Sequence, residues 1–177
     1  MVFDPKANLV DFLLSPADIS KEAMQQAEDL AIKLVKCLDF VGLMAVEMFQ
    51  DKSGTILINE IAPRPHNSGH QTIEGNITSQ YAQHIRAILG MPLGDTAIIR
   101  PAVMLNLLGE AGFSGKVFYE GMEKVLAKSG VYVHLYGKTE TRPFRKMGHI
   151  TVTGKTSDEV VAKAMSIRNM TRVISKD

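Results

Sequence analysis

Residues 59–70 read NEIAPRPHNSGH, and they directly follow the apolar run TILI at residues 55–58. The apolar run is typical of a β-strand. The two prolines after it end regular structure, because each removes a backbone N–H donor and restricts the residue before it. The segment therefore holds a carboxylate, an arginine and two histidines on a fixed, extended path. Charged groups are costly to bury without partners, so this arrangement predicts a ligand site.

A predicted β-hairpin brings a second carboxylate to this segment. Residues 43–49 and 55–59 are the expected strands, joined by a loop at 51–54. With that loop, Glu47 lies opposite Ile58, and Glu60 is its diagonal neighbour on the same sheet face, roughly 7–8 Å away. Such a pair suits Mg²⁺, a hard cation that takes oxygen ligands, and Asn59 can add an amide oxygen. A solvated surface without a metal is the alternative interpretation.

Arg64 and His66 lie on either side of Pro65, in an extended segment that points alternate residues the same way. An arginine fork beside an imidazole suits a small planar oxyanion, with the histidine available for proton transfer. The alternative is structural, with the arginine capping a carbonyl and the histidine packed on a proline.

A cluster of basic residues lies much later in the chain, after an apolar run at 131–136. It can be a phosphate site, in which a lysine point charge and an arginine fork hold one dianion. It can equally be a solvated surface, as most short charge runs are. Its members are Lys138, Arg142, Arg145, Lys146 and His149.

Composition excludes several classes of protein. A net charge of +1 argues against a nucleic-acid binder, and a single cysteine cannot form an internal disulfide. No apolar window is long enough to span a bilayer, and the N-terminus lacks the pattern of a signal peptide, so we expect a cytoplasmic protein. Phosphate-cradling glycine loops, cysteine metal motifs and nucleophile elbows are also lacking.

Periodicity predicts an α/β (α+β) protein with two lobes, residues 1–95 and 96–177. Cys37 is expected to be packed within the first helix, and His84 to lie on the surface of the second. Tyr81, Ile85, Ile88 and Leu89 are expected to form the buried stripe of that second helix. The predicted helices are 20–39, 78–89, 121–128 and 156–170, and the remaining predicted strands are 9–14, 102–108, 131–136 and 148–153.

The segment at 59–70, with MAVEMF before it and TSQYAQHIRAILGMP after it, resembles the N5-carboxyaminoimidazole ribonucleotide synthetase family of ATP-grasp enzymes. The later segment HLYGKTETRPFRKMGH resembles that family's C-terminal phosphate-binding signature. The resemblance covers essentially the whole chain. A formate-dependent glycinamide ribonucleotide transformylase has a similar ExxPRPH but departs at NSGH, so it is the second choice.

The resemblance implies an ATP-dependent carboxylation of aminoimidazole ribonucleotide by bicarbonate, through carboxyphosphate, in purine biosynthesis. It implies Mg²⁺ on Glu47 and Glu60, with Asn59 and Glu60 against the ATP phosphates. Arg64 and His66 would face bicarbonate or carboxyphosphate. Lys138 and Arg145 would hold the 5'-phosphate of the ribonucleotide.

The resemblance also sets expectations for the molecule as a whole. Residues 1–95 would be the C-terminal part of an ATP-grasp lobe with an antiparallel sheet and helices, and 96–177 a small β-rich lobe. Members of the family are about twice this length and commonly homodimers. We therefore expect a C-terminal fragment that is inactive alone. The alternative hypothesis is a non-catalytic module for phosphate binding or dimerisation.

Overall fold

The computed structural model describes the backbone of residues 2–4 and 9–176 and the side chains of residues 12–176. The chain forms two compact units, one of residues 17–97 and one that joins residues 1–16 to 98–177. In order, the elements are β1 (Val2–Asp4), β2 (Leu9–Ser15), α1 (Lys21–Cys37), β3 (Ala45–Gln50), β4 (Ile56–Ala62), η1 (Asn67–Gly69), α2 (Thr72–Gly75), α3 (Gln80–Ile88), β5 (Ala102–Leu108), β6 (Gly115–Glu120), α4 (Met122–Leu126), β7 (Val131–Leu135), β8 (Glu140–Thr141), β9 (Lys146–Thr153), α5 (Ser157–Arg168) and β10 (Arg172–Ser175).

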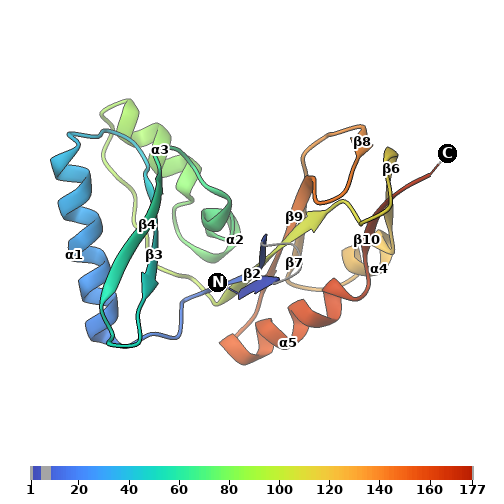
Figure 1. The fold of residues 1–177 in the computed structure, drawn as a ribbon, viewed down its shortest axis with the longest axis horizontal. Coiled ribbons are helices and arrows are strands. Elements are labelled where there is room, and N and C mark those ends of the chain that lie inside the picture. The colour runs from blue at the N-terminus through green and yellow to red at the C-terminus, as the bar shows by residue number, and fades with distance from the viewer. Residues whose placement is uncertain (1, 5–8, 177) are drawn as a thin grey trace. The chain divides into compact units, whose positions relative to one another are not determined.

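The unit of residues 17–97 is built around the β3–β4 hairpin, with α1 packed against it (Figure 1). Helix α1 begins where the Ser20 hydroxyl accepts a hydrogen bond from the Ala23 N–H, which satisfies one of the free donors of the first turn. Helix α3 begins in the same way, with the Ser79 hydroxyl accepting from the Ala82 N–H. The loop between β4 and α3 contains η1 and α2.

The other unit has a five-stranded antiparallel sheet in the order β1-β2-β5-β9-β7. Helix α5 packs on one face of this sheet (Figure 1), and Val103, Ile150 and Val160 lie in the core between them. A smaller sheet has the order β10-β6-β8. The Thr156 hydroxyl caps α5 by accepting from the Glu159 N–H, and the Glu159 carboxylate accepts from the N–H of Lys155, the residue before the cap.

The two units differ from the predicted lobes at the N-terminus. Strand β2 pairs with β5 from Phe12 opposite Leu105 to Ser15 opposite Ala102, so it extends the sheet of the later residues. The predicted boundary near residue 95 lies close to the observed change at 97–98. Sequence periodicity identified the early strand but contained no information about its partner.

Several expectations about single side chains are wrong. Cys37 is exposed rather than packed, because it lies in the last turn of α1 outside the buried stripe. His84 is half-buried rather than a surface residue, and its Nδ1 accepts a hydrogen bond from the Leu43 N–H at 3.0 Å. The expected buried stripe of α3 is exposed: Tyr81 41%, Ile85 50%, Ile88 50% and Leu89 65%.

Candidate active site: a carboxylate pair and a histidine

A β-bulge places Glu47 and Glu60 directly opposite one another. Gln50 pairs with Ile56 and Met48 with Ile58, but Glu47 pairs with Glu60, so Asn59 is the extra residue of β4. The hairpin turn is also one residue longer than predicted. The diagonal arrangement expected from the sequence is therefore wrong, and the two carboxylates are closer neighbours than predicted, since directly opposed Cβ atoms lie about 4.5–5.5 Å apart.

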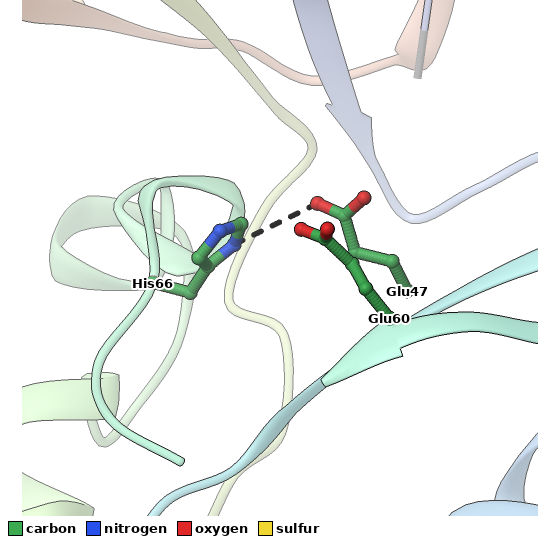
Figure 2. A group of neighbouring side chains, drawn as sticks. All are labelled: Glu47, Glu60 and His66. Carbon is green, nitrogen blue, oxygen red and sulfur yellow. Dashed lines mark ion pairs between the residues drawn. The ribbon is translucent and has the colours of Figure 1, made fainter. Parts of the chain in front are cut away.

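His66 completes a three-residue cluster with these glutamates. Figure 2 shows both carboxylates pointing to the same side of the hairpin, toward the imidazole. One ligand atom from each of Glu47, Glu60 and His66 lies within 4.8 Å of the others, and His66 Nδ1 is 3.9 Å from Glu47 Oε1. The prolines at 63 and 65 end β4 and carry the chain across to this position, as the sequence predicted for a rigid, charged turn.

The His66 ring is held by its own loop. Its Nδ1 lies 2.9 Å from the Ser68 hydroxyl and accepts a weaker hydrogen bond from the Ser68 N–H at 3.4 Å. Its Nδ1 thus has two partners in the same loop, the hydroxyl and the backbone N–H of Ser68. His66 Nδ1 also lies 3.9 Å from Glu47 Oε1, so the loop holds the imidazole beside the carboxylate pair.

The donor set fits a hard divalent cation. Mg²⁺ binds oxygen at about 2.0–2.1 Å, and carboxylate oxygens from two neighbouring side chains are ligands that it takes. Glu47 and His66 are half-buried while Glu60 is exposed, which leaves room for water and phosphate oxygens that Mg²⁺ also takes as ligands. Glu47 and Glu60 would hold the ion, and it would supply charge neutralisation for a transferring phosphoryl group.

Asn59 and Arg64 lie beside the cluster but are not members of it. Asn59 is exposed at the bulge. Arg64 is also exposed, and its Nη1 donates to the Pro65 carbonyl at 3.1 Å, which is the structural alternative that the sequence left open. Within the part of the chain that the structure describes, this is the one hydrogen bond of the Arg64 guanidinium, so most of its donors are available for an anion.

Lys138 and Arg145 lie in the other unit, on the connection between β7 and β9 that contains β8. Each donates to a backbone carbonyl, Lys138 Nζ to Lys146 at 2.5 Å and Arg145 Nη1 to Glu140 at 2.8 Å. His149 differs from the rest of the predicted basic cluster because it is buried in β9, where its ring stacks on His134 at a centroid distance of 4.5 Å. The solvated-surface interpretation is therefore wrong for this residue.

Sequence reasoning did not single out Gln80. Gln80 is 5% exposed and hydrogen-bonds to the backbone of His66, a residue fourteen positions earlier. Nothing in local spacing signals a contact of that range. The Tyr81 hydroxyl lies 2.8 Å from His70 Nδ1, and burial raises the pKa of the Tyr81 phenol.

Comparison with known proteins defines the class. The ATP-grasp domain family matches residues 5–81, and the phosphoribosylaminoimidazole carboxylase C-terminal domain family matches residues 102–163. The chain thus combines part of an ATP-grasp domain, which carries the carboxylate pair, with a C-terminal domain known from purine-pathway carboxylases.

Comparison with individual proteins identifies the family within the ATP-grasp class. The chain is 46% identical over 152 residues to the N5-carboxyaminoimidazole ribonucleotide synthase of Bacillus subtilis, a match that covers 86% of this chain and 38% of the relative. The crystal structure of N5-carboxyaminoimidazole ribonucleotide synthetase from Thermotoga maritima superposes with a TM-score of 0.91 at 49% identity, over 94% of this chain and 46% of that one. The chain belongs to the N5-carboxyaminoimidazole ribonucleotide synthetase family of ATP-grasp enzymes.

A structure from Aspergillus clavatus adds ligands to the comparison. It contains ADP and 5-aminoimidazole ribonucleotide, and it matches 91% of this chain and 43% of its own length with a TM-score of 0.81 at 37% identity. The chain spans less than half the length of each of these three relatives. The mixed helix and antiparallel-sheet fold expected from the sequence is confirmed.

Proposed function

We propose that this chain contributes two parts of the active site of an N5-carboxyaminoimidazole ribonucleotide synthetase. One part is the pair of carboxylates that binds the metal for phosphoryl transfer, and the other is the site that binds the phosphate of the ribonucleotide. The observation that carries the proposal is the direct opposition of Glu47 and Glu60 with His66 beside them. Relatives with this name are up to 49% identical to the chain over the matched part, and related structures contain ADP, ATP or the ribonucleotide.

The proposed reaction has two steps. A bicarbonate oxygen attacks the γ-phosphorus of ATP, the bond to the β–γ bridging oxygen breaks, and carboxyphosphate and ADP form. The exocyclic amine of aminoimidazole ribonucleotide then attacks the carboxyl carbon, the carbon–oxygen bond to phosphate breaks, and the amine loses a proton. Both steps develop negative charge on oxygens, so cations and fixed donors aimed at them lower the barrier.

Each predicted residue has a role in this scheme. Glu47 and Glu60 hold Mg²⁺, and Asn59 and Glu60 lie against the ATP phosphates. Arg64 binds bicarbonate and carboxyphosphate through guanidinium donors that its hydrogen bond to the Pro65 carbonyl leaves available. His66 moves the proton of the reacting amine, and Lys138 and Arg145 hold the 5'-phosphate. A cytoplasmic location, expected from the sequence, is also part of the proposal.

A chimera tests this function without requiring that the 177 residues work alone. Residues 9–170 would replace the corresponding segment of the Bacillus subtilis relative, with which the chain is 46% identical. We expect ADP release that depends on both bicarbonate and aminoimidazole ribonucleotide, and a loss of at least 100-fold in the Glu60→Gln chimera. A folded chimera that binds ATP but shows no ribonucleotide-stimulated ADP release would overturn the proposal.

The isolated chain should show no substrate-stimulated turnover, because it spans less than half of the relatives' length. Steady-state ADP release with and without the ribonucleotide measures this. Robust stimulated turnover by the 177 residues would show that the site is complete within them.

A non-catalytic phosphate-binding module is the second candidate. It is favoured by Lys138 and Arg145 lying in a unit with its own core of residues around Val103 and Ile150. It predicts that the isolated chain binds aminoimidazole ribonucleotide, and that the double variant Lys138→Ala/Arg145→Ala binds at least tenfold more weakly by calorimetry. Equal affinity of the two proteins would exclude this role.

We also propose a homodimer, supported by the exposed apolar residues Ile85, Ile88 and Leu89 on and beside α3. Sedimentation velocity over a concentration series should show association that Ile85→Lys weakens. Leu126→Lys, at an exposed leucine of the other unit, serves as the matched control. A monomer at every concentration would contradict the proposal for this chain.

A further inference from the structure

The side chain of Gln80 pairs with the backbone of His66 as a neighbouring strand would. The His66 N–H donates to Gln80 Oε1 at 2.8 Å, and Gln80 Nε2 donates to the His66 carbonyl at 2.8 Å. At 5% exposure the amide is shielded from water, so losing either bond would leave a buried polar group unsatisfied. The backbone of His66 is thus fixed at both of its hydrogen-bonding groups.

Further contacts set the position of the amide itself. Gln80 Nε2 also lies 3.0 Å from His70 Nδ1, and the Gln80 N–H donates to the Thr72 hydroxyl, which donates to the Gly69 carbonyl. A β-carbon at Gly69 would lie 2.5 Å from Gln80 Oε1, so the turn at Gly69 packs closely against the Gln80 side-chain amide and has no room for a larger residue. Gln80 therefore ties the first turn of α3 to the loop that carries His66.

We infer that Gln80 is a positioning residue that holds His66 against the Glu47–Glu60 pair. The direction of an imidazole follows from its backbone and its χ angles. Gln80 fixes the backbone, while Ser68 hydrogen-bonds to the ring. When a group that orients a site residue by hydrogen bonding is removed, metal affinity or activity typically falls 10–100-fold. This inference rests on the proposed function for its consequence, but not for its geometry.

Gln83 provides a matched control on the same helix. Its Oε1 accepts from the Gly94 N–H at 2.8 Å and its Nε2 donates to the Gly94 carbonyl at 2.7 Å. The two glutamines thus make the same kind of two-bond contact with a backbone, but Gln83 holds residue 94 instead of His66. A purely structural role would make the two positions equivalent.

The experiment compares Gln80→Glu with Gln83→Glu in the full 177-residue chain. A carboxylate still accepts from a backbone N–H but cannot donate to a carbonyl, so each variant breaks half of its contact. The ring signals of His66, assigned by their loss in His66→Asn, are compared by NMR at one fixed pH. Mn²⁺ affinity is measured by calorimetry.

Gln80→Glu should shift the His66 ring signals and weaken Mn²⁺ binding about tenfold. Gln83→Glu should leave both readouts at wild-type values. Unchanged His66 signals in folded Gln80→Glu, or equal changes in the two variants, would overturn the inference. If Gln80→Glu does not fold, Gln80→Met removes the same donor at similar volume and is judged by the same signals.

A third result separates this inference from the proposed function. Shifted His66 signals with no Mn²⁺ binding in either wild type or variant would uphold the positioning role. That result would remove the metal from the proposed site.

Discussion

At the scale of single residues, the opposed pair Glu47 and Glu60 is costly without a cation. Like charges directly opposite one another destabilise a strand pair by roughly 0.2–1 kcal/mol. Because Glu60 is exposed, water screens the repulsion between Glu47 and Glu60, so we expect a cost near the lower end of this range. A bound Mg²⁺ would reverse the sign of the interaction, because it replaces repulsion with two attractive contacts. The same two side chains thus either weaken the hairpin or stabilise it.

Glu60→Gln should therefore raise the free energy of unfolding by a few tenths of a kcal/mol in buffer with EDTA. It should also abolish the stabilisation by Mg²⁺, which for the wild type is about 2.7 kcal/mol at a hundredfold excess over the dissociation constant. Urea unfolding with and without Mg²⁺ measures both effects. Glu28→Gln, at an exposed position of α1, is the control. Equal stabilisation of Glu60→Gln and wild type by Mg²⁺ would contradict a metal site at this pair.

Cys37 gives a second prediction at this scale. Its exposure at the end of α1 means that a thiol reagent can reach it in the folded protein. Titration with Ellman's reagent should therefore modify one thiol per chain without denaturant. Reaction that begins only in denaturant would restore the packed thiol expected from the sequence.

At the scale of elements, the turn of the β3–β4 hairpin is organised by Asp51. Its Oδ1 accepts from the Ser53 N–H at 2.8 Å, the Ser53 hydroxyl at 2.6 Å and the Thr55 N–H at 2.9 Å. The hydrogen bond from the Ser53 side chain, followed by that from the Thr55 backbone, lowers the pKa of Asp51. This turn sets the start of the register that brings Glu47 opposite Glu60.

Asp51→Ala should destabilise the hairpin at neutral pH, and the difference from wild type should disappear in acid. A carboxyl whose pKa is lower in the folded state stabilises above the unfolded pKa, and this stability is lost as the pH falls through the folded pKa. The loss should occur below the ordinary aspartate value of 3.8. Urea midpoints at a series of pH values, with Asp18→Ala as an exposed control, measure it. A difference that persists unchanged in acid would show that charge has no part in the effect.

The helices were easier to predict than the strands. Thr156 and Ser20 mark helix starts because their hydroxyls cap free N–H groups locally. Strands β6 and β10 were missed. In β6, half-buried and exposed residues alternate from Gly115 to Glu120, but the sequence analysis assigned this segment to no strand. Four-residue β10 lies at the end of the chain and is a strand because it pairs with β6, a contact with no local signal.

At the scale of the whole molecule, the assignment of β2 to the later unit has a measurable consequence. Leu13 is 8% exposed and lies opposite Met104 of β5, and the neighbouring Phe12 and Leu14 pack against the core. The earliest described side chains of the protein therefore stabilise its C-terminal sheet.

Leu13→Ala should cost about 2–5 kcal/mol, the range for a large-to-small change in a core. Hydrogen exchange should become faster at the amides of β5 and β9 and stay unchanged in α1 and α3. Ile19→Ala, at a residue 44% exposed, should have a much smaller effect. Faster exchange in α1 and the β3–β4 hairpin instead would assign this strand to the unit of residues 17–97.

The sequence by itself determined the local features: a strand that ends at prolines, capped helices, and a segment from Asn59 to His70 rich in ligand-type side chains. These follow from properties of neighbouring residues, such as fixed φ angles, missing donors and hydroxyl caps. Its resemblance to a family with specific motifs was also contained in the residues alone.

Only the tertiary structure decided which groups meet. The bulge at Asn59 turned a diagonal carboxylate pair into a direct one, and the Gln80 amide reached His66 across fourteen positions. It also placed β2 beside β5 and left Cys37 and the α3 stripe exposed. The physical reason is that register, burial and long-range hydrogen bonds depend on the packing of distant segments, which is not encoded in the spacing of neighbouring residues.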